Sequence, residues 1–212
     1  MNYRLAYAIG FHPWEDAAND PVFVGKFHEL IDREENDRSR PFGPALDIGT
    51  GSGIWGIELA KRGWQVIGVD NIPKALHRAR ERVQLAGVNM QLVEGDVTAI
   101  RRTGIRAGFR LVLDTGTFHD FDPAQQQTMG QEIDAVATSD ASILLLVWPR
   151  RLRPLIRGAS RAEIEAAFTN WKITHVEASH FQLPKLLQAI LRPDEHWYRL
   201  TKNKLNISEP FG

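Results

Sequence analysis

The segment that most constrains the fold is Ala45-Leu-Asp-Ile-Gly-Thr-Gly-Ser-Gly53, in which a short apolar run leads directly into closely spaced glycines. Apolar residues follow at roughly helical spacing, and Arg62-Gly63 ends that run as a helix C-cap would. Glycines let the backbone approach a ligand because no Cβ stands in the way, and a helix N-terminus offers free N–H groups. The segment therefore predicts a strand, a ligand-binding turn and a helix.

From Pro44 onward, short β-rich runs alternate with longer helical patterns, which is typical of βαβ units in a parallel sheet. We expect an α/β fold with a doubly wound, mostly parallel, seven-stranded Rossmann-like sheet. A helix at 75–86 follows Pro73, and Ser160 and Glu163 form a capping box that opens a helix through Phe168. The expected strands are 45–48, 65–69, 90–94, 110–114, 143–148, 173–178 and 197–201.

With 212 residues, the chain is expected to form a single domain, 1–212. Residues 44–212 are predicted to be the α/β core, with an insertion near 181–193. Residues 1–43 are predicted to form an N-terminal helical lid. Both the lid segment and the insertion carry aromatic and aliphatic residues, so we expect them to cover the carboxyl ends of the strands, where ligands bind in open α/β sheets.

Composition excludes several mechanisms and partners. Lys and Arg together number 26, as do Asp and Glu, so no strong overall field draws in nucleic acid. The absence of cysteine removes disulfides, thiolate metal sites and cysteine nucleophiles. No signal peptide is visible at the N-terminus, and the longest apolar run, 143–148, is too short to cross a membrane. We expect a cytoplasmic protein without membrane partners; nothing in the sequence indicates its oligomeric state.

Two cofactor types compete for the glycine-rich turn. Gly51, Gly53 and Gly56 match the dinucleotide fingerprint G-x-G-x-x-G. However, Asp47 ends the strand just before the first glycine and would repel a pyrophosphate, whereas a cofactor with an ammonium and a sulfonium group suits it. Asp70 ends the second strand at the spacing of a ribose-binding carboxylate. The sulfonium cofactor is the favoured interpretation.

On these residues the sequence resembles the class I S-adenosylmethionine-dependent methyltransferases, whose first motif is similar to Asp47-x-Gly49-x-Gly51-x-Gly53. The resemblance covers about residues 45–148. It implies S-adenosylmethionine as cofactor, with the glycine loop on its methionyl part, Asp70 on the ribose hydroxyls, and Asp96 with Val97 at the adenine. The predicted cofactor-binding residues are Asp47, Gly49, Thr50, Gly51, Gly53, Asp70, Asn71, Asp96, Val97 and Asp114.

The part of the site that binds the methyl acceptor, here called the acceptor side, is predicted from the run Asp114-Thr-Gly-Thr-Phe-His119. It is similar to a pattern in methyltransferases that act on small thiols, halides, thiopurines or heterocyclic hydroxyls, although Thr117 replaces the Cys or Leu often found there. Pro13-Trp14-Glu15 resembles a Pro-Trp-Asp lid element of the same group, with Glu for Asp. The Asn/Asp-Pro-Pro-aromatic turn of enzymes that methylate nucleobase amines is missing. A small-molecule acceptor is therefore expected, and nucleic acid is not.

The candidate residues on the acceptor side each have a catalytic or binding interpretation and a structural one. His119 is the predicted general base, because imidazole titrates near neutrality; alternatively it fixes its loop by hydrogen bonds. The predicted substrate contacts are Phe11, His12, Trp14 and Phe118, although aromatic residues also serve as core. No metal site is expected, because Asp122-Pro123 is typical of a helix N-cap and first turn.

Arginines crowd the stretch after the fifth strand, namely Arg150, Arg151, Arg153 and Arg157. They suit an acidic acceptor or a phosphate-bearing partner, or simply a solvated loop. The alternatives to a methyltransferase are an NAD(P)-dependent oxidoreductase and a non-catalytic S-adenosylmethionine-binding protein.

Overall fold

The computed structural model describes residues 15, 17–36, 38–150, 157–180 and 195–203 of the chain. Their centre is a seven-stranded sheet in the order β3-β2-β1-β4-β5-β7-β6. The pairs from β3 to β5 are parallel, whereas β7 is antiparallel to both β5 and β6. The strands are β1 (Pro44–Ile48), β2 (Gln65–Asp70), β3 (Met90–Glu94), β4 (Phe109–Asp114), β5 (Ala137–Val147), β6 (Trp171–Ala178) and β7 (His196–Lys202).

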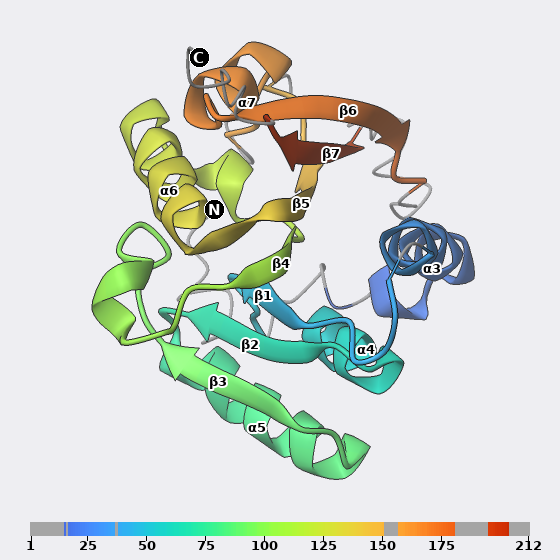
Figure 1. Ribbon diagram of the computed structural model, residues 1–212. Coiled ribbons are helices and arrows are strands. Elements are labelled where there is room, and N and C mark those ends of the chain that lie inside the picture. The colour runs from blue at the N-terminus through green and yellow to red at the C-terminus, as the bar shows by residue number, and fades with distance from the viewer. Residues whose placement is uncertain (1–14, 16, 37, 151–156, 181–194, 204–212) are drawn as a thin grey trace, which may run out of the picture.

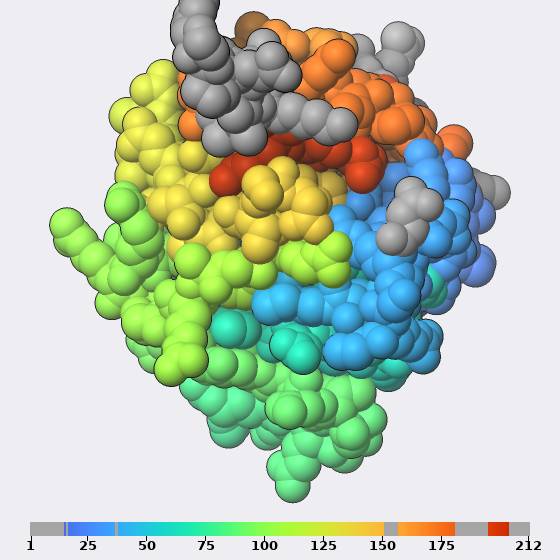
Figure 2. Space-filling model, in the orientation of Figure 1, coloured from blue at the N-terminus to red at the C-terminus, as the bar shows by residue number. Residues whose placement is uncertain are grey.

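This architecture confirms the predicted doubly wound, mostly parallel sheet of seven strands. The largest difference is β5, which begins at Ala137 instead of 143. Its first residues are polar and partly exposed, so an apolar pattern does not mark them, but Ala137 pairs with Phe109 across an irregular register. On the surface, the residues of β7 in red lie between those of β5 in yellow and the orange of β6 (Figure 2).

Helices cover both faces of the sheet (Figure 1). One face carries α3 (Pro21–Glu35), α4 (Ile54–Arg62) and α5 (Pro73–Ala86), and the other carries η2 (Ile100–Thr103), α6 (Pro123–Val136) and α7 (Arg161–Ala167). Strand residues alternate between the two cores: Val112 joins the core of α6 and α7, and its neighbours Leu111 and Leu113 join that of α3 and α4. The described part of the chain contains no helix with the length and apolarity to span a membrane.

Local signals for helix ends are confirmed. Asp122 accepts the backbone N–H of Gln125 at 2.9 Å in a capping box, with Pro123 opening α6. Ser160 and Glu163 form the predicted box at α7. These motifs were predictable because each is built from residues within one helical turn.

Helix α3 corrects the expectation that residues 1–43 cover the carboxyl ends of the strands. The helix buries Phe23, Phe27, Leu30 and Ile31 against the face of the sheet, because an apolar stripe of this length needs a broad surface. Phe27 lies 4.7 Å from the ring of Trp55, between ring centroids. Ahead of this helix, the structure describes Glu15 and η1 (Ala17–Asn19).

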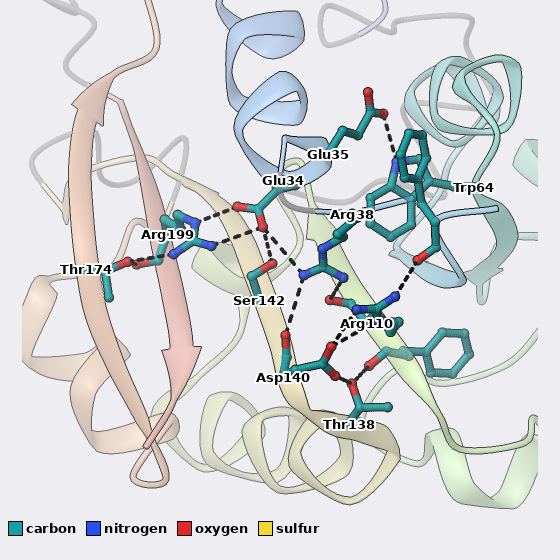
Figure 3. A network of polar contacts seen from close by, with 12 residues as sticks. Glu34, Glu35, Arg38, Trp64, Arg110, Thr138, Asp140, Ser142, Thr174 and Arg199 are labelled. Carbon is teal, nitrogen blue, oxygen red and sulfur yellow. Dashed lines mark hydrogen bonds and ion pairs between the residues drawn. The ribbon is translucent and has the colours of Figure 1, made fainter. Parts of the chain in front are cut away.

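A buried carboxylate fixes the far end of α3 to the sheet (Figure 3). Glu34 is 2% exposed and accepts hydrogen bonds from Ser142 Oγ at 2.5 Å and from Arg199 Nε and Nη2 at 2.5 and 3.1 Å. Arg38 Nη2 lies 4.0 Å away. The two arginines and the hydroxyl compensate the desolvation of this charge.

Replacing Glu34 by Gln is expected to lower the free energy of unfolding by about 3 kcal/mol, because Arg199 and Ser142 lose their anionic partner inside the protein. Urea titration measures the change. Glu29→Gln, at an exposed position of the same helix, is the control and should change stability by less than about 1 kcal/mol. Equal stability of the two variants would contradict this role.

Candidate active site

The glycine loop sits at the carboxyl end of β1, where the sequence predicted it. Gly49, Gly51 and Gly53 have φ angles of 60°, 55° and 79°, in the left-handed region that favours glycine. The loop is tied to β2 because Thr50 N donates to Val69 O at 3.0 Å and Gly51 N donates to Asp70 Oδ2 at 2.8 Å. The predicted loop between β1 and α4 is thus hydrogen-bonded to the end of the neighbouring strand β2.

Space, as well as backbone conformation, requires glycine in this region. A Cβ on Gly49 would stand 1.9 Å from Thr117 Oγ1, and one on Gly56 would stand 2.7 Å from Asp47 Oδ2. Gly56 therefore allows α4 to pack closely against β1. The match of this glycine to the dinucleotide fingerprint did not by itself separate such a packing role from a role in binding a ligand.

Asp47 is buried beneath the loop, at 1% exposure. Burial raises its pKa to about 7, with the nearby charges of Asp114 and Asp70 adding to the rise and the bond from Thr50 opposing it. Thr50 Oγ1 donates to Asp47 Oδ2 at 2.5 Å, while Oδ1 is buried without a hydrogen-bond partner among the described residues. A buried acceptor without a partner suits a cationic ligand group and is unfavourable beside a pyrophosphate.

Asp70 ends β2 and contacts the glycine loop, and Asp96 follows the end of β3, the neighbouring strand. Asp70 accepts Gly51 N on one oxygen and Ile72 N at 2.9 Å on the other; burial nevertheless raises its pKa. Each carboxylate oxygen has a further lone pair, so ribose hydroxyls fit the remaining capacity. Asp96 is exposed and accepts Thr98 N at 2.8 Å, and the adjacent Val97 is 5% exposed. Asn71 is exposed at the start of the turn after β2.

Asp114 organises the loop after β4. Its Oδ1 accepts the N–H groups of Gly116 and Thr117 at 2.8 and 2.7 Å, and its Oδ2 accepts Phe118 N at 3.0 Å. Burial raises its pKa to about 6 in spite of these bonds. The carboxylate is 0% exposed and engaged with three backbone N–H groups, so Asp114 shapes this loop; its predicted contact with the cofactor stays a prediction.

His119 and Phe118 point into the protein from η3 (Phe118–Asp120). His119 is 3% exposed, its Nδ1 lies 3.4 Å from Leu146 O, and burial lowers its pKa to about 4. The ring is therefore neutral at pH 7 and a weak base. Phe118 is 0% exposed and packs on Phe168 at 5.5 Å between ring centroids, which places it in the core and not in a pocket wall.

Several predicted residues lie outside the described part of the chain: Phe11, His12, Trp14, Arg151, Arg153 and the insertion near 181–193. Arg150 is described and pairs with Glu163. Sequence reasoning missed Ser52, Arg78 and Arg82, which meet Glu15 beside the glycine loop. Only Glu15 had a sequence signal, its place in the Pro-Trp-Glu element.

A pocket of about 260 Å³ opens at the carboxyl end of β5, beside the start of β7. Apolar and polar side chains share its wall. The lining residues are Val147, Pro149, Arg150, Ala159, Ser160, His196 and Tyr198.

The fold and the site together define an open α/β protein with a glycine-rich loop and buried acids at the carboxyl edge of its sheet, the edge at which proteins of this class bind their ligands. An antiparallel seventh strand inserted between β5 and β6 distinguishes it from the six-stranded dinucleotide fold. Residues 45–140 match the family model described as a methyltransferase domain. The chain is thus similar to methyltransferases in the sequence of this segment and in its fold.

Named relatives and solved structures agree with this family. A 2-heptyl-1-hydroxyquinolin-4(1H)-one methyltransferase of Mycobacteroides abscessus is 25% identical over 146 residues, 68% of this chain and 63% of that protein. A protein-L-isoaspartate O-methyltransferase of Chlorobium phaeovibrioides is 31% identical over 97 residues, 41% of this chain and 42% of that protein. The chain thus matches less than two thirds of the length of either relative.

Among solved structures, the N-methyltransferase NodS of Bradyrhizobium japonicum, in complex with S-adenosyl-L-homocysteine, has the same fold. The TM-score is 0.72 at 14% identity, covering 91% of this chain and 92% of that chain. NodS holds S-adenosyl-L-homocysteine, and the acids and glycines at the ends of β1 and β2 of this chain are suited to a ligand of that kind.

Proposed function

We propose that the protein transfers the methyl group of S-adenosylmethionine to a small-molecule acceptor. The observation that carries the proposal is Asp47, whose buried Oδ1 has no partner among the described residues beneath the glycine loop. A cofactor with an ammonium and a sulfonium group would supply the missing positive charge. In this proposal Asp47 and the loop orient the methionyl part, Asp70 binds the ribose, and Asp96 and Val97 flank the adenine.

The bound cofactor supplies an electrophilic methyl group, and the protein contributes orientation and exclusion of water. The pKa of His119, about 4, disfavours it as a strong base. Its contact with Leu146 O supports instead the role of joining the loop after β4 to β5. We therefore expect an acceptor whose nucleophilic atom needs little help with deprotonation.

An acidic hydroxyl on an aromatic heterocycle meets that requirement. The Mycobacteroides relative, named for a hydroxyquinolinone, supports the same acceptor class. Thiols that ionise near neutral pH are the next class to examine.

Calorimetric titration with S-adenosyl-L-homocysteine, run beside NADH, tests the cofactor. We expect micromolar binding of the former alone, followed by product formation from S-adenosylmethionine with hydroxylated heterocycles in a panel that also contains thiols and amines. Binding of NADH alone would restore the oxidoreductase interpretation. Binding of S-adenosyl-L-homocysteine without turnover across the panel would favour a non-catalytic binding protein.

A further inference from the structure

An ion-pair cluster joins three segments beside the glycine loop. Glu15 Oε2 accepts hydrogen bonds from Arg78 Nη2 at 2.9 Å and from Arg82 Nη2 at 2.7 Å, both from α5. The second terminal nitrogen of Arg82, Nη1, donates to Ser52 Oγ at 2.5 Å. One guanidinium therefore spans the distance between Glu15 and the glycine loop.

The cluster is more than a solvated surface pair. Ser52 is 3% exposed and the side chain of Glu15 is 11% exposed. Burial by itself would raise the pKa of Glu15, but hydrogen bonds from Arg82 and Ser52 and the charges of Arg82 and Arg78 lower it. The carboxylate is thus held in its charged form between two cations.

Ser52 stands between Gly51 and Gly53, both in left-handed backbone conformations. Glycine loses more conformational freedom on ordering than any other residue, so a loop with three glycines is costly to order around a ligand. A side chain fixed at position 52 restrains the peptide groups that join Ser52 to Gly51 and to Gly53, and the next N–H along the loop, that of Gly51, donates to Asp70.

We propose, on the basis of the proposed function, that Glu15 and Arg82 are positioning residues which hold the glycine loop in its cofactor-binding conformation through Ser52. Arg82 bridges Glu15 and Ser52, Ser52 also interacts directly with Glu15, and Glu15 fixes the orientation of the Arg82 guanidinium. Neither residue needs to touch the cofactor.

The test uses affinity for S-adenosyl-L-homocysteine, measured by calorimetry on Glu15→Gln, Ser52→Ala and the double variant. We expect each single change to raise Kd about tenfold, the effect of losing one charge-assisted hydrogen bond. If Glu15, Arg82 and Ser52 act as one connected network, the double variant should bind about as well as either single one. Arg82→Lys keeps the charge but not the two-pronged bridge, and should also bind about tenfold more weakly.

Glu35→Gln is the matched control. Glu35 forms a two-pronged pair with Arg62, with hydrogen bonds of 2.8 and 2.6 Å, and its side chain is 12% exposed, close to the 11% of Glu15. The pair lies near Trp64, which precedes β2 and so lies at the opposite edge of the sheet. Glu35→Gln should leave the Kd unchanged whatever it does to the Tm.

Unchanged Kd in Glu15→Gln and Arg82→Lys, with wild-type protein that binds normally, would overturn the positioning role and leave the proposed function intact. Additive losses in the double variant would overturn the bridge. Failure of the wild-type protein to bind S-adenosyl-L-homocysteine is a different result, because it overturns the proposed function and this inference with it.

Discussion

Asp47→Asn is expected to weaken binding of S-adenosyl-L-homocysteine by roughly tenfold to a hundredfold, the loss of one charge-assisted contact in a buried site. The variant keeps the size of the side chain and a hydrogen-bond acceptor, so the change isolates the charge. Calorimetry at pH 8 measures it, with NADH as a ligand that should gain nothing from the acid. Equal affinity of variant and wild type would exclude Asp47 as the cation-binding residue.

The same substitution has an opposite effect on stability. The usual pKa of this carboxyl is 3.8, whereas burial raises it to about 7 in the folded protein. Between these values folding takes up a proton, so the free energy of unfolding of the ligand-free wild type falls as pH rises and levels off above about pH 7. Asn does not ionise. The variant should therefore have the higher Tm at pH 8, and the two proteins should converge near pH 4.

Ligand binding reports the same titration. Because a bound cation favours the ionised carboxylate, affinity of the wild type should rise as pH increases from 5 towards 7 and then level off. Asp47→Asn should lose this dependence. If the affinity of the wild type does not depend on pH, the positive charge of the cofactor pairs with a group other than Asp47.

Gly49→Ala is expected to abolish measurable cofactor binding. The new Cβ would stand 1.9 Å from Thr117 Oγ1 and 3.1 Å from its Cβ, so the loops after β1 and β4 must separate. The φ of +60° adds backbone strain. Overpacking of this kind costs about 1 to 3 kcal/mol of stability, and the displaced loop is the one proposed to bind the cofactor.

Gly87→Ala provides the control, because Gly87 has a φ of +64° but no atom within 4 Å of an added Cβ. It bears the backbone strain alone, at the C-cap of α5, and should lower the Tm slightly while leaving Kd for S-adenosyl-L-homocysteine unchanged. Retained binding in Gly49→Ala would mean that Thr117 yields without moving the loop. Thermal unfolding and calorimetry on both variants separate strain from steric exclusion.

Much of the site was predictable from local pattern. One βα unit is identified by the apolar run before Gly49 and by the glycines that follow it. The neighbouring unit is identified by Asp70 at the end of its strand, and neither needs knowledge of packing. Parallel strands place their carboxyl ends at one edge, so acids that end successive strands meet there. The helix ends at Asp122 and Ser160 were predictable for the same local reason.

Other features depend on contacts between residues far apart in the chain. Arg82 meets Ser52 and Glu15 across 30 and 67 positions. Phe118 was a candidate pocket residue by sequence, and only its packing on Phe168 places it in the core. Asp114 ends a strand just as Asp70 does, but three backbone N–H groups engage it.

The sequence by itself determined the order of strands and helices, the left-handed turn at the glycines and the acids beside it, because periodicity and backbone dihedrals are set within a few residues. Tertiary structure alone decided the antiparallel position of β7, the burial of α3 on the sheet and the pKa values of Asp47 and His119. Strand pairing and desolvation depend on which distant surfaces come together, and no local pattern encodes that.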